Sequence, residues 1–470
     1  MQKSRLVRIL RTFTKKEVRD FRKWLHSPAH NQREDVVAIF EYLVAGDHLE
    51  KDELLDKTVI FPHVYPQEPF DDAKIRQGMH FLLKAMEDFL VYQDLLEDEV
   101  RSKVVLAKVY RQRQLGRSFK RTMQAARKLQ EQQSLRNRHY LQNEYDLQYE
   151  EYSYLSGLRR TVPLNLQEVS NSMDVAYLAN KLRQSCLMLA HQTVFKTEYE
   201  IGLLEEVFKF VENKHYLDVP AIAIYYYAYK ATKERDNEEY FQRLKEQIIE
   251  HGDLFPQSEI RDIYLLAINY TIGRMNAGVE QYVRETFELY RRGLEKKILI
   301  QNGLLSRFTF MNAVINGAML KEYDWTERFI HEYKDYMEEQ YRENVVHYSL
   351  ARLHYEKKDY ATAMRLFSQV EYDDILLNLN AKTLLLKMYY EEDELDLLEA
   401  LLESMRMYMR RKKVIGYHKA NFKNIITITK KLVHVNPYDK TQRENLHKEI
   451  LETNPLPERK WLLKQVEEMG

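Results

Sequence analysis

The sequence predicts an all-α fold arranged as an α-solenoid, and three observations carry that prediction. Only 13 Gly and 10 Pro occur in 470 residues, so few positions interrupt helices. No segment of useful length alternates apolar and polar residues as a half-buried strand does. Through residues 344–405, apolar residues at helical spacing recur with an offset of 35 positions, and a fixed period of this size is typical of stacked helix pairs.

The length of the chain predicts several parts. A chain of 470 residues is longer than a single hydrophobic core usually supports. We expect a small N-terminal helical domain at residues 1–98, a degenerate helical-repeat solenoid at 99–435, and a C-terminal helical cap at 436–470.

The first domain carries clear helix signals. Thr14 and Glu17 have the spacing of a capping box, in which each side chain satisfies a free backbone N–H at a helix start. Pro28 ends that helix, and the three prolines in residues 61–70 predict a loop. Asp71 is then expected to open a long helix that closes the domain.

Two consecutive helix pairs are expected between Asn344 and Met405. In the first copy, the positions that would face each other across the pair are Leu350, Ala351, His354, Ala363, Phe367 and Val370. In the second copy, the same spacing selects Leu385, Leu386, Tyr389, Leu398, Leu402 and Met405. The recurrence predicts that both copies share one register.

This spacing resembles the tetratricopeptide-repeat (TPR) pattern, in which Leu, Gly and Tyr of one helix pack against Ala and Phe of the next. Ala351 and Leu386 stand where that family prefers Gly, and His354 replaces its aromatic residue. The resemblance implies a right-handed solenoid of TPR-like pairs. The segments at 13–31 and 455–469 are also similar to pieces of uncharacterised bacterial helical-repeat proteins, a likeness that implies no activity.

Further copies are expected upstream. Second helices are predicted to begin near Tyr199, Asn237, Gly278, Asp324, Tyr360 and Glu394. The letters at 320–325 echo those at 355–360 with the same offset of 35. This register places Arg328 and Glu332 in the slots of Ala363 and Phe367, so the neighbouring Phe329 and Tyr333 are expected to supply the core.

Tyrosine, of which the chain has 34, concentrates in the expected first helices. In the TPR family, first helices line a concave groove that takes extended peptides. Carried over by register, the candidate partner-binding residues are Tyr348, Arg352, Tyr355, Thr383, Lys387 and Tyr390. The Lys and Asn pattern with which some members clamp a C-terminal carboxylate is not evident. Packing between repeats is the alternative use of any single tyrosine.

Signatures of enzymes are missing from the sequence. It contains no Gly-rich phosphate loop, no nucleophile elbow and no HExxH pattern. Cys186 is the one cysteine, which excludes a multi-cysteine zinc site. His347 and His354 are two helical turns apart, about 10 Å, too far to share a metal ion. We therefore expect no enzymatic activity, no cofactor and no metal.

The same features predict a cytoplasmic protein. A lone cysteine cannot form an intramolecular disulfide, which fits a reducing compartment. The first 13 residues mix basic and apolar side chains instead of forming the apolar core of a signal peptide. The longest uncharged run, residues 219–229, is shorter than a membrane span.

The charges are balanced overall but locally uneven. The formal net charge is zero, which argues against a surface wholly tuned for nucleic acid. Yet residues 101–138 hold twelve Lys or Arg against one acid, and residues 406–432 hold nine against none. Within the second tract, the candidate phosphate-binding residues are Arg410, Arg411, Lys412 and Lys413.

Two functions are therefore expected from the sequence. The first is a non-enzymatic scaffold that binds a protein or peptide partner on the concave face of the solenoid. The alternative is nucleic-acid or ribonucleoprotein binding through the basic tracts, because such tracts neutralise phosphates and nearby aromatic rings stack on exposed bases. Solvated helix faces are the plainer interpretation of the same charges.

Overall fold

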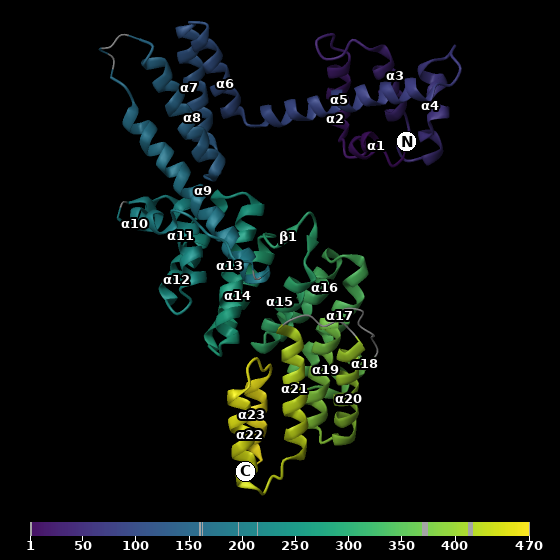
Figure 1. The fold of residues 1–470 in the computed structure, drawn as a ribbon, viewed down its shortest axis with the longest axis vertical. Coiled ribbons are helices and arrows are strands. Elements are labelled where there is room, and N and C mark those ends of the chain that lie inside the picture. The colour runs from purple at the N-terminus through teal and green to yellow at the C-terminus, as the bar shows by residue number, and fades with distance from the viewer. Residues whose placement is uncertain are drawn as a thin grey trace. The chain divides into compact units, whose positions relative to one another are not determined.

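A computed structural model describes residues 2–158, 161, 163–195, 197–213, 215–368, 375–411 and 417–469. In this part of the chain the fold is all-α, as predicted, with a single two-stranded hairpin. The chain divides into two compact units, residues 1–177 and 178–470. The division falls within helix α9 (Leu166–Phe195). Figure 1 shows the order of the elements.

The first unit contains eight helices and one 3₁₀ turn before α9 in its described part. They are α1 (Arg5–Leu10), α2 (Lys15–Leu25), α3 (Glu34–Val44), η1 (Asp52–Leu55), α4 (Lys57–Val64), α5 (Asp72–Glu97), α6 (Glu99–Gln112), α7 (Gly116–Gln132) and α8 (Arg138–Leu155). One hydrophobic core joins α1 to α5, and its buried members run from Leu6 to Phe89. A separate core joins α6, α7 and α8.

Of the two local predictions for the first unit, the capping box is confirmed and the loop is partly wrong. The capping box is present, because the Thr14 N–H donates to Glu17 Oε2 at 2.7 Å and the Glu17 N–H donates to Thr14 Oγ1 at 3.2 Å. The loop predicted for residues 61–70 is partly wrong, since α4 continues through Pro62 to Val64. Pro62 has no N–H, so the helical hydrogen bond to the carbonyl four residues earlier is missing at this position.

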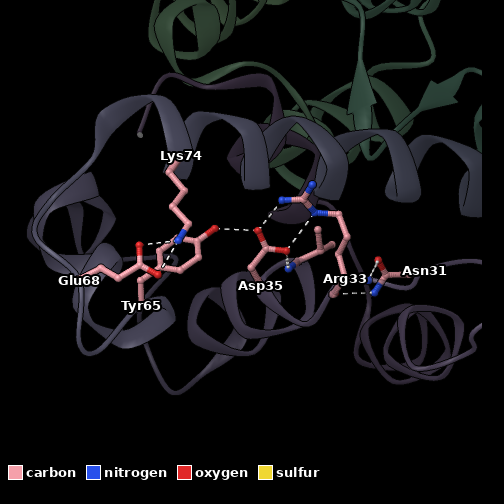
Figure 2. A network of polar contacts seen from close by, with 7 residues as sticks. Asn31, Arg33, Asp35, Tyr65, Glu68 and Lys74 are labelled. Carbon is pink, nitrogen blue, oxygen red and sulfur yellow. Dashed lines mark hydrogen bonds and ion pairs between the residues drawn. The ribbon is translucent and has the colours of Figure 1, made fainter.

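A polar network fastens α3 to the segment between α4 and α5 (Figure 2). Asp35 accepts hydrogen bonds from Arg33 Nη2 and from the Tyr65 hydroxyl, both at 2.7 Å. Lys74 lies 4.2 Å from the Tyr65 ring centroid and pairs with Glu68. Burial alone would raise the pKa of Asp35, but these hydrogen bonds outweigh it and lower the pKa below its usual value. The network therefore stabilises the contact between α3, the segment after α4, and α5.

The second unit continues with consecutive helices to its end. Its described elements are α10 (Leu204–Asn213), η2 (Tyr216–Asp218), α11 (Pro220–Lys233), α12 (Glu238–His251), η3 (Gly252–Leu254), α13 (Gln257–Asn276), α14 (Gln281–Glu295), β1 (Ile300–Gln301), β2 (Leu304–Leu305), α15 (Arg307–Met319), α16 (Tyr323–Tyr333), η4 (Lys334–Tyr336), α17 (Glu339–Glu356), α18 (Tyr360–Ser368), α19 (Ile375–Glu391), α20 (Leu395–Arg411), α21 (Tyr417–His434), α22 (Lys440–Glu452) and α23 (Arg459–Glu468). Neighbours in the sequence pack as pairs, with α11 against α12, α13 against α14, α17 against α18, and α19 against α20 (Figure 1).

First helices also contact the next first helix: α11 packs on α13, α15 on α17, and α17 on α19. Five of the six predicted starts of second helices are confirmed to within three residues, at Glu238, Gln281, Tyr323, Tyr360 and Leu395. The start predicted near Tyr199 is wrong, because α10 begins only at Leu204. Seven of the repeat positions are confirmed as core, because Ala351, Ala363 and Phe367 are buried in one cluster, and Leu386, Leu398, Leu402 and Met405 are buried in the next. The remaining described positions, Leu350, His354, Leu385 and Tyr389, are only partly buried. Val370 lies outside the described residues.

The register assigned upstream was wrong by two residues. The turns within the pairs α15/α16, α17/α18 and α19/α20 each contain a residue with left-handed backbone, at Lys321, Lys358 and Asp393, with φ values of 62°, 63° and 59°. Alignment on these turns matches Ala363 with Thr326 and Phe367 with Ile330. Both Thr326 and Ile330 are fully buried. They occupy the core positions that the offset of 35 residues had assigned to Arg328 and Glu332.

The hairpin β1–β2 interrupts the helices between α14 and α15. Ile300 pairs with Leu305 and Gln301 with Leu304. Asn302 and Gly303, which connect the strands, both have positive φ, at 52° and 77°. An Asn-Gly pair suits such a two-residue turn, because both residues tolerate left-handed backbone.

Candidate binding groove

The six residues predicted to bind a partner lie on two helices in contact. Tyr348, Arg352 and Tyr355 belong to α17, and Thr383, Lys387 and Tyr390 belong to α19. Tyr348, Tyr355, Thr383 and Lys387 are buried, whereas Arg352 and Tyr390 are partly exposed. A lysine at 7% exposure requires an electrostatic partner, because an unpaired buried ammonium is costly. We call the surface formed by these six side chains and by Glu391, the last residue of α19, the α17–α19 groove.

The partner of Lys387 comes from a distant part of the sequence. Its Nζ lies 2.6 Å from Oε2 of Glu458, 71 residues further along the chain. Glu458 is the N-cap of α23 and has φ of 56°, a left-handed conformation that is unfavourable for a residue with a Cβ. Lys387 also lies 5.2 Å from the Tyr355 ring centroid and 5.7 Å from that of Trp461.

Trp461 of α23 forms the second contact with the groove. Its indole N–H donates to Oε1 of Glu391, the last residue of α19, at 2.8 Å. The Trp461 ring meets the Tyr390 ring edge-on, with the centroids 5.6 Å apart. The other oxygen of Glu391 accepts from Lys358 at 3.0 Å and from the Tyr360 hydroxyl. Glu391 therefore connects α18, α19 and α23.

The charges of the groove favour ionised carboxylates. Burial pushes the pKa of Glu458 upward, but Lys387 and Arg352 reverse this effect and lower it below the usual value. Burial also opposes ionisation of Glu391, and hydrogen bonds from Tyr360, Lys358 and Trp461 again lower its pKa. Both carboxylates are thus charged near neutral pH and stabilise the docking of α23.

A cavity of about 480 Å³ with a mixed polar and apolar lining adjoins the groove. Its lining comes from α13, α15, α17, α19, α21 and the residues before α23, and it comprises Ile272, Met275, Asn312, Ile315, Asn316, Tyr348, Arg352, Asn380, Thr383, Leu384, Asn421, Phe422, Pro457 and Glu458. Asn316 Oδ1, Asn421 Oδ1 and Arg352 Nε are buried and have no hydrogen-bond partner among the described residues. The cavity can hold water or polar ligand groups.

The contact between the groove and α23 was missed by sequence reasoning. Neither Glu391 nor Trp461 was among the candidate partner-binding residues. One signal was available, because Glu458 follows Pro457 and precedes Trp461 by three residues, which is a spacing that places both side chains on one helical face.

Tyrosines of the first helices are used mainly for packing. Those that the structure buries are Tyr225, Tyr226, Tyr229, Tyr264, Tyr270, Tyr348 and Tyr355. The aromatic core between α12, α13 and α14 is an example, with Phe241 stacked on Tyr270 at 4.7 Å and edge-on to Tyr282 at 5.7 Å. The packing alternative is therefore confirmed for these residues.

The structure describes all of the first basic tract, residues 101–138, but only part of the second, residues 406–432. On α6, on α7 and in the turn between them, the exposed cations are Arg101, Lys108, Arg113, Arg117, Lys120, Arg121 and Lys128. Arg111 and Arg127 instead pair with Glu150 and Glu151 of α8. In the later tract, Arg410 and Arg411 end α20 and are exposed, while Lys412 and Lys413 lie outside the described residues.

Metal-ligand clusters, the cysteine and the histidines are the groups of the described chain that bear on catalysis. Within the described ranges, no cluster of three or more His, Cys, Asp or Glu could hold a metal ion. Cys186 is buried, its thiol donates to the Tyr225 carbonyl at 3.2 Å, and burial raises its pKa, so it is a poor nucleophile. His354 Nδ1 lies 2.9 Å from Asp359 Oδ2 at the turn to α18. None of the helices in the described chain combines the length and apolar character needed to cross a bilayer.

Comparison of the chain with family models, with curated proteins and with solved structures gave no match. Inference about function therefore rests on the sequence and on the geometry of the groove.

Proposed function

We propose that this chain is a non-enzymatic, cytoplasmic protein-interaction scaffold, and that a polypeptide partner binds the concave face of a right-handed α-solenoid of TPR-like helix pairs. Contacts between successive first helices support the solenoid, as do the left-handed turn residues that recur at Lys321, Lys358 and Asp393. Repeated pairs of this kind create extended concave surfaces that suit polypeptide ligands.

One observation carries the proposed function. The α17–α19 groove holds a polypeptide segment remote in sequence through an ion pair, an indole hydrogen bond and aromatic contacts. Lys387, Glu391 and Tyr390 thus form a surface that is complementary to a helix start. A surface that recognises a segment of its own chain has the chemistry to recognise a similar segment of a partner.

Affinity capture with a matched lysine control tests the scaffold. The tagged full chain is compared with Lys387→Met in the groove and with Lys430→Met at an exposed position of α21. We expect wild type and Lys430→Met to recover the same proteins from native lysate, and Lys387→Met to lose a subset of them. Identical recovery by all three would contradict the proposal. Lys387 is a better probe than Tyr355, which is part of a hydrophobic core.

Nucleic-acid binding is a second candidate, favoured by the exposed cations of α6 and α7. We expect a labelled mixed-sequence single-stranded RNA to bind with an affinity that falls steeply with salt, because bound phosphates release counterions. Replacing Arg117, Lys120 and Arg121 by Gln should reduce the slope of log K against log salt by about two to three. A flat salt response, or an unchanged slope in the triple variant, would eliminate this candidate.

A further inference from the structure

The two anchors of α23 have complementary partners on one face of α19. Glu458 and Trp461 are three residues apart, and Lys387 and Glu391 are four apart, so each pair spans about one helical turn. The ammonium of Lys387 meets the carboxylate of Glu458, and the carboxylate of Glu391 accepts from the indole of Trp461. The groove therefore provides contacts for a segment in which an acidic residue is followed three positions later by tryptophan.

The resident segment fits this groove imperfectly. Glu458 adopts left-handed backbone, which carries strain for a residue other than Gly. Beside it, the cavity keeps a guanidinium Nε of Arg352 and the carboxamide oxygens of Asn316 and Asn421 without partners among the described residues. Because unpaired buried polar atoms are unfavourable, a segment without this strain that also supplies polar groups to the cavity would bind better.

We propose that the α17–α19 groove binds a partner helix whose first turn carries an acidic residue three positions before a tryptophan, and that this partner displaces the chain's own α23. The inference rests on the proposed scaffold function and specifies the partner and its regulation. The tether makes α23 an intramolecular competitor at high effective concentration. A partner therefore binds only to the fraction of molecules in which α23 has left the groove, and its apparent affinity falls by that fraction.

A peptide with the sequence of residues 453–469 tests the proposal against the full chain. Fluorescence anisotropy measures its binding to wild type and to the double variant Glu458→Gln and Trp461→Ala, in which the resident anchors are removed. We expect the double variant to bind the peptide at least about tenfold more tightly than wild type does. Adding Lys387→Met to that variant, or making the two anchor substitutions in the peptide, should abolish the gain.

Hydrogen exchange provides a second readout on the unmodified chain. A saturating concentration of the peptide should accelerate amide exchange in α22 and α23 of wild type, because the peptide displaces them. Equal affinity for wild type and the double variant, binding that survives loss of the anchors from the peptide, or unchanged exchange in α22 and α23 would each overturn the proposal. Such a failure, with capture still dependent on Lys387, would leave the scaffold function intact.

Discussion

Replacing Phe241 by Ala is expected to lower the free energy of unfolding of the second unit by about 3–5 kcal/mol. The Phe241 side chain is fully buried, so its loss leaves a cavity between Tyr270 and Tyr282, which cannot collapse without disrupting their own contact at 5.6 Å. Denaturant unfolding followed by circular dichroism measures the change. The result would show that the aromatic residues of α12–α14 act as core.

Phe308→Ala is the control for that prediction, because Phe308 is 53% exposed at the start of α15. Its removal should change the free energy of unfolding by less than about 1 kcal/mol. Similar losses for both variants would show that burial in the structure does not govern stability at these positions.

Replacing Lys387 by Met is expected to destabilise the docking of α23 by roughly 2–4 kcal/mol. The substitution leaves the Glu458 carboxylate without its ion-pair partner, and the side chain of Glu458 retains 32% exposure, so the cost is smaller than for a fully buried charge. Met preserves contact with Tyr355 and Trp461. Amide hydrogen exchange in α22 and α23 reports the local opening, and Lys430→Met should leave it unchanged.

The pH dependence of this docking has a defined sign. The pKa of Glu458 and that of Glu391 are lowered in the folded chain. Their contribution is therefore fully present above the usual carboxylate pKa and is lost as the pH falls through the lowered values. The free energy of local opening of α23, obtained from exchange rates corrected for their intrinsic pH dependence, should therefore fall on acidification in wild type, and the fall should be smaller in Glu458→Gln.

The helix pairs could be predicted because their signals are local. Starts at Tyr360 and Leu395 follow from apolar spacing and from the acidic residue before each helix. The two-residue error before Tyr323 has a physical cause. The turn is set by left-handed backbone at Lys321, the residue equivalent to Lys358 and Asp393, and lysine is not a residue type that sequence patterns associate with that conformation.

The groove could be predicted only in part. Register assigned all six candidate residues to α17 and α19, but it gave no indication that the groove holds a segment of the same chain. That contact joins Lys387 to a residue 71 positions away, and periodicity within a helix contains no information about such pairs. Burial of Tyr348 and Thr383 likewise depends on which elements cover them.

A double-mutant cycle between Lys387 and Glu458 tests the central claim most directly. The free energy of local opening of α23, obtained from hydrogen exchange, is compared for wild type, Lys387→Met, Glu458→Gln and the combined variant. If the α17–α19 groove holds α23 through this ion pair, the coupling free energy should be about 1–3 kcal/mol. A coupling of zero within error, with each single variant exchanging like wild type, would contradict the account.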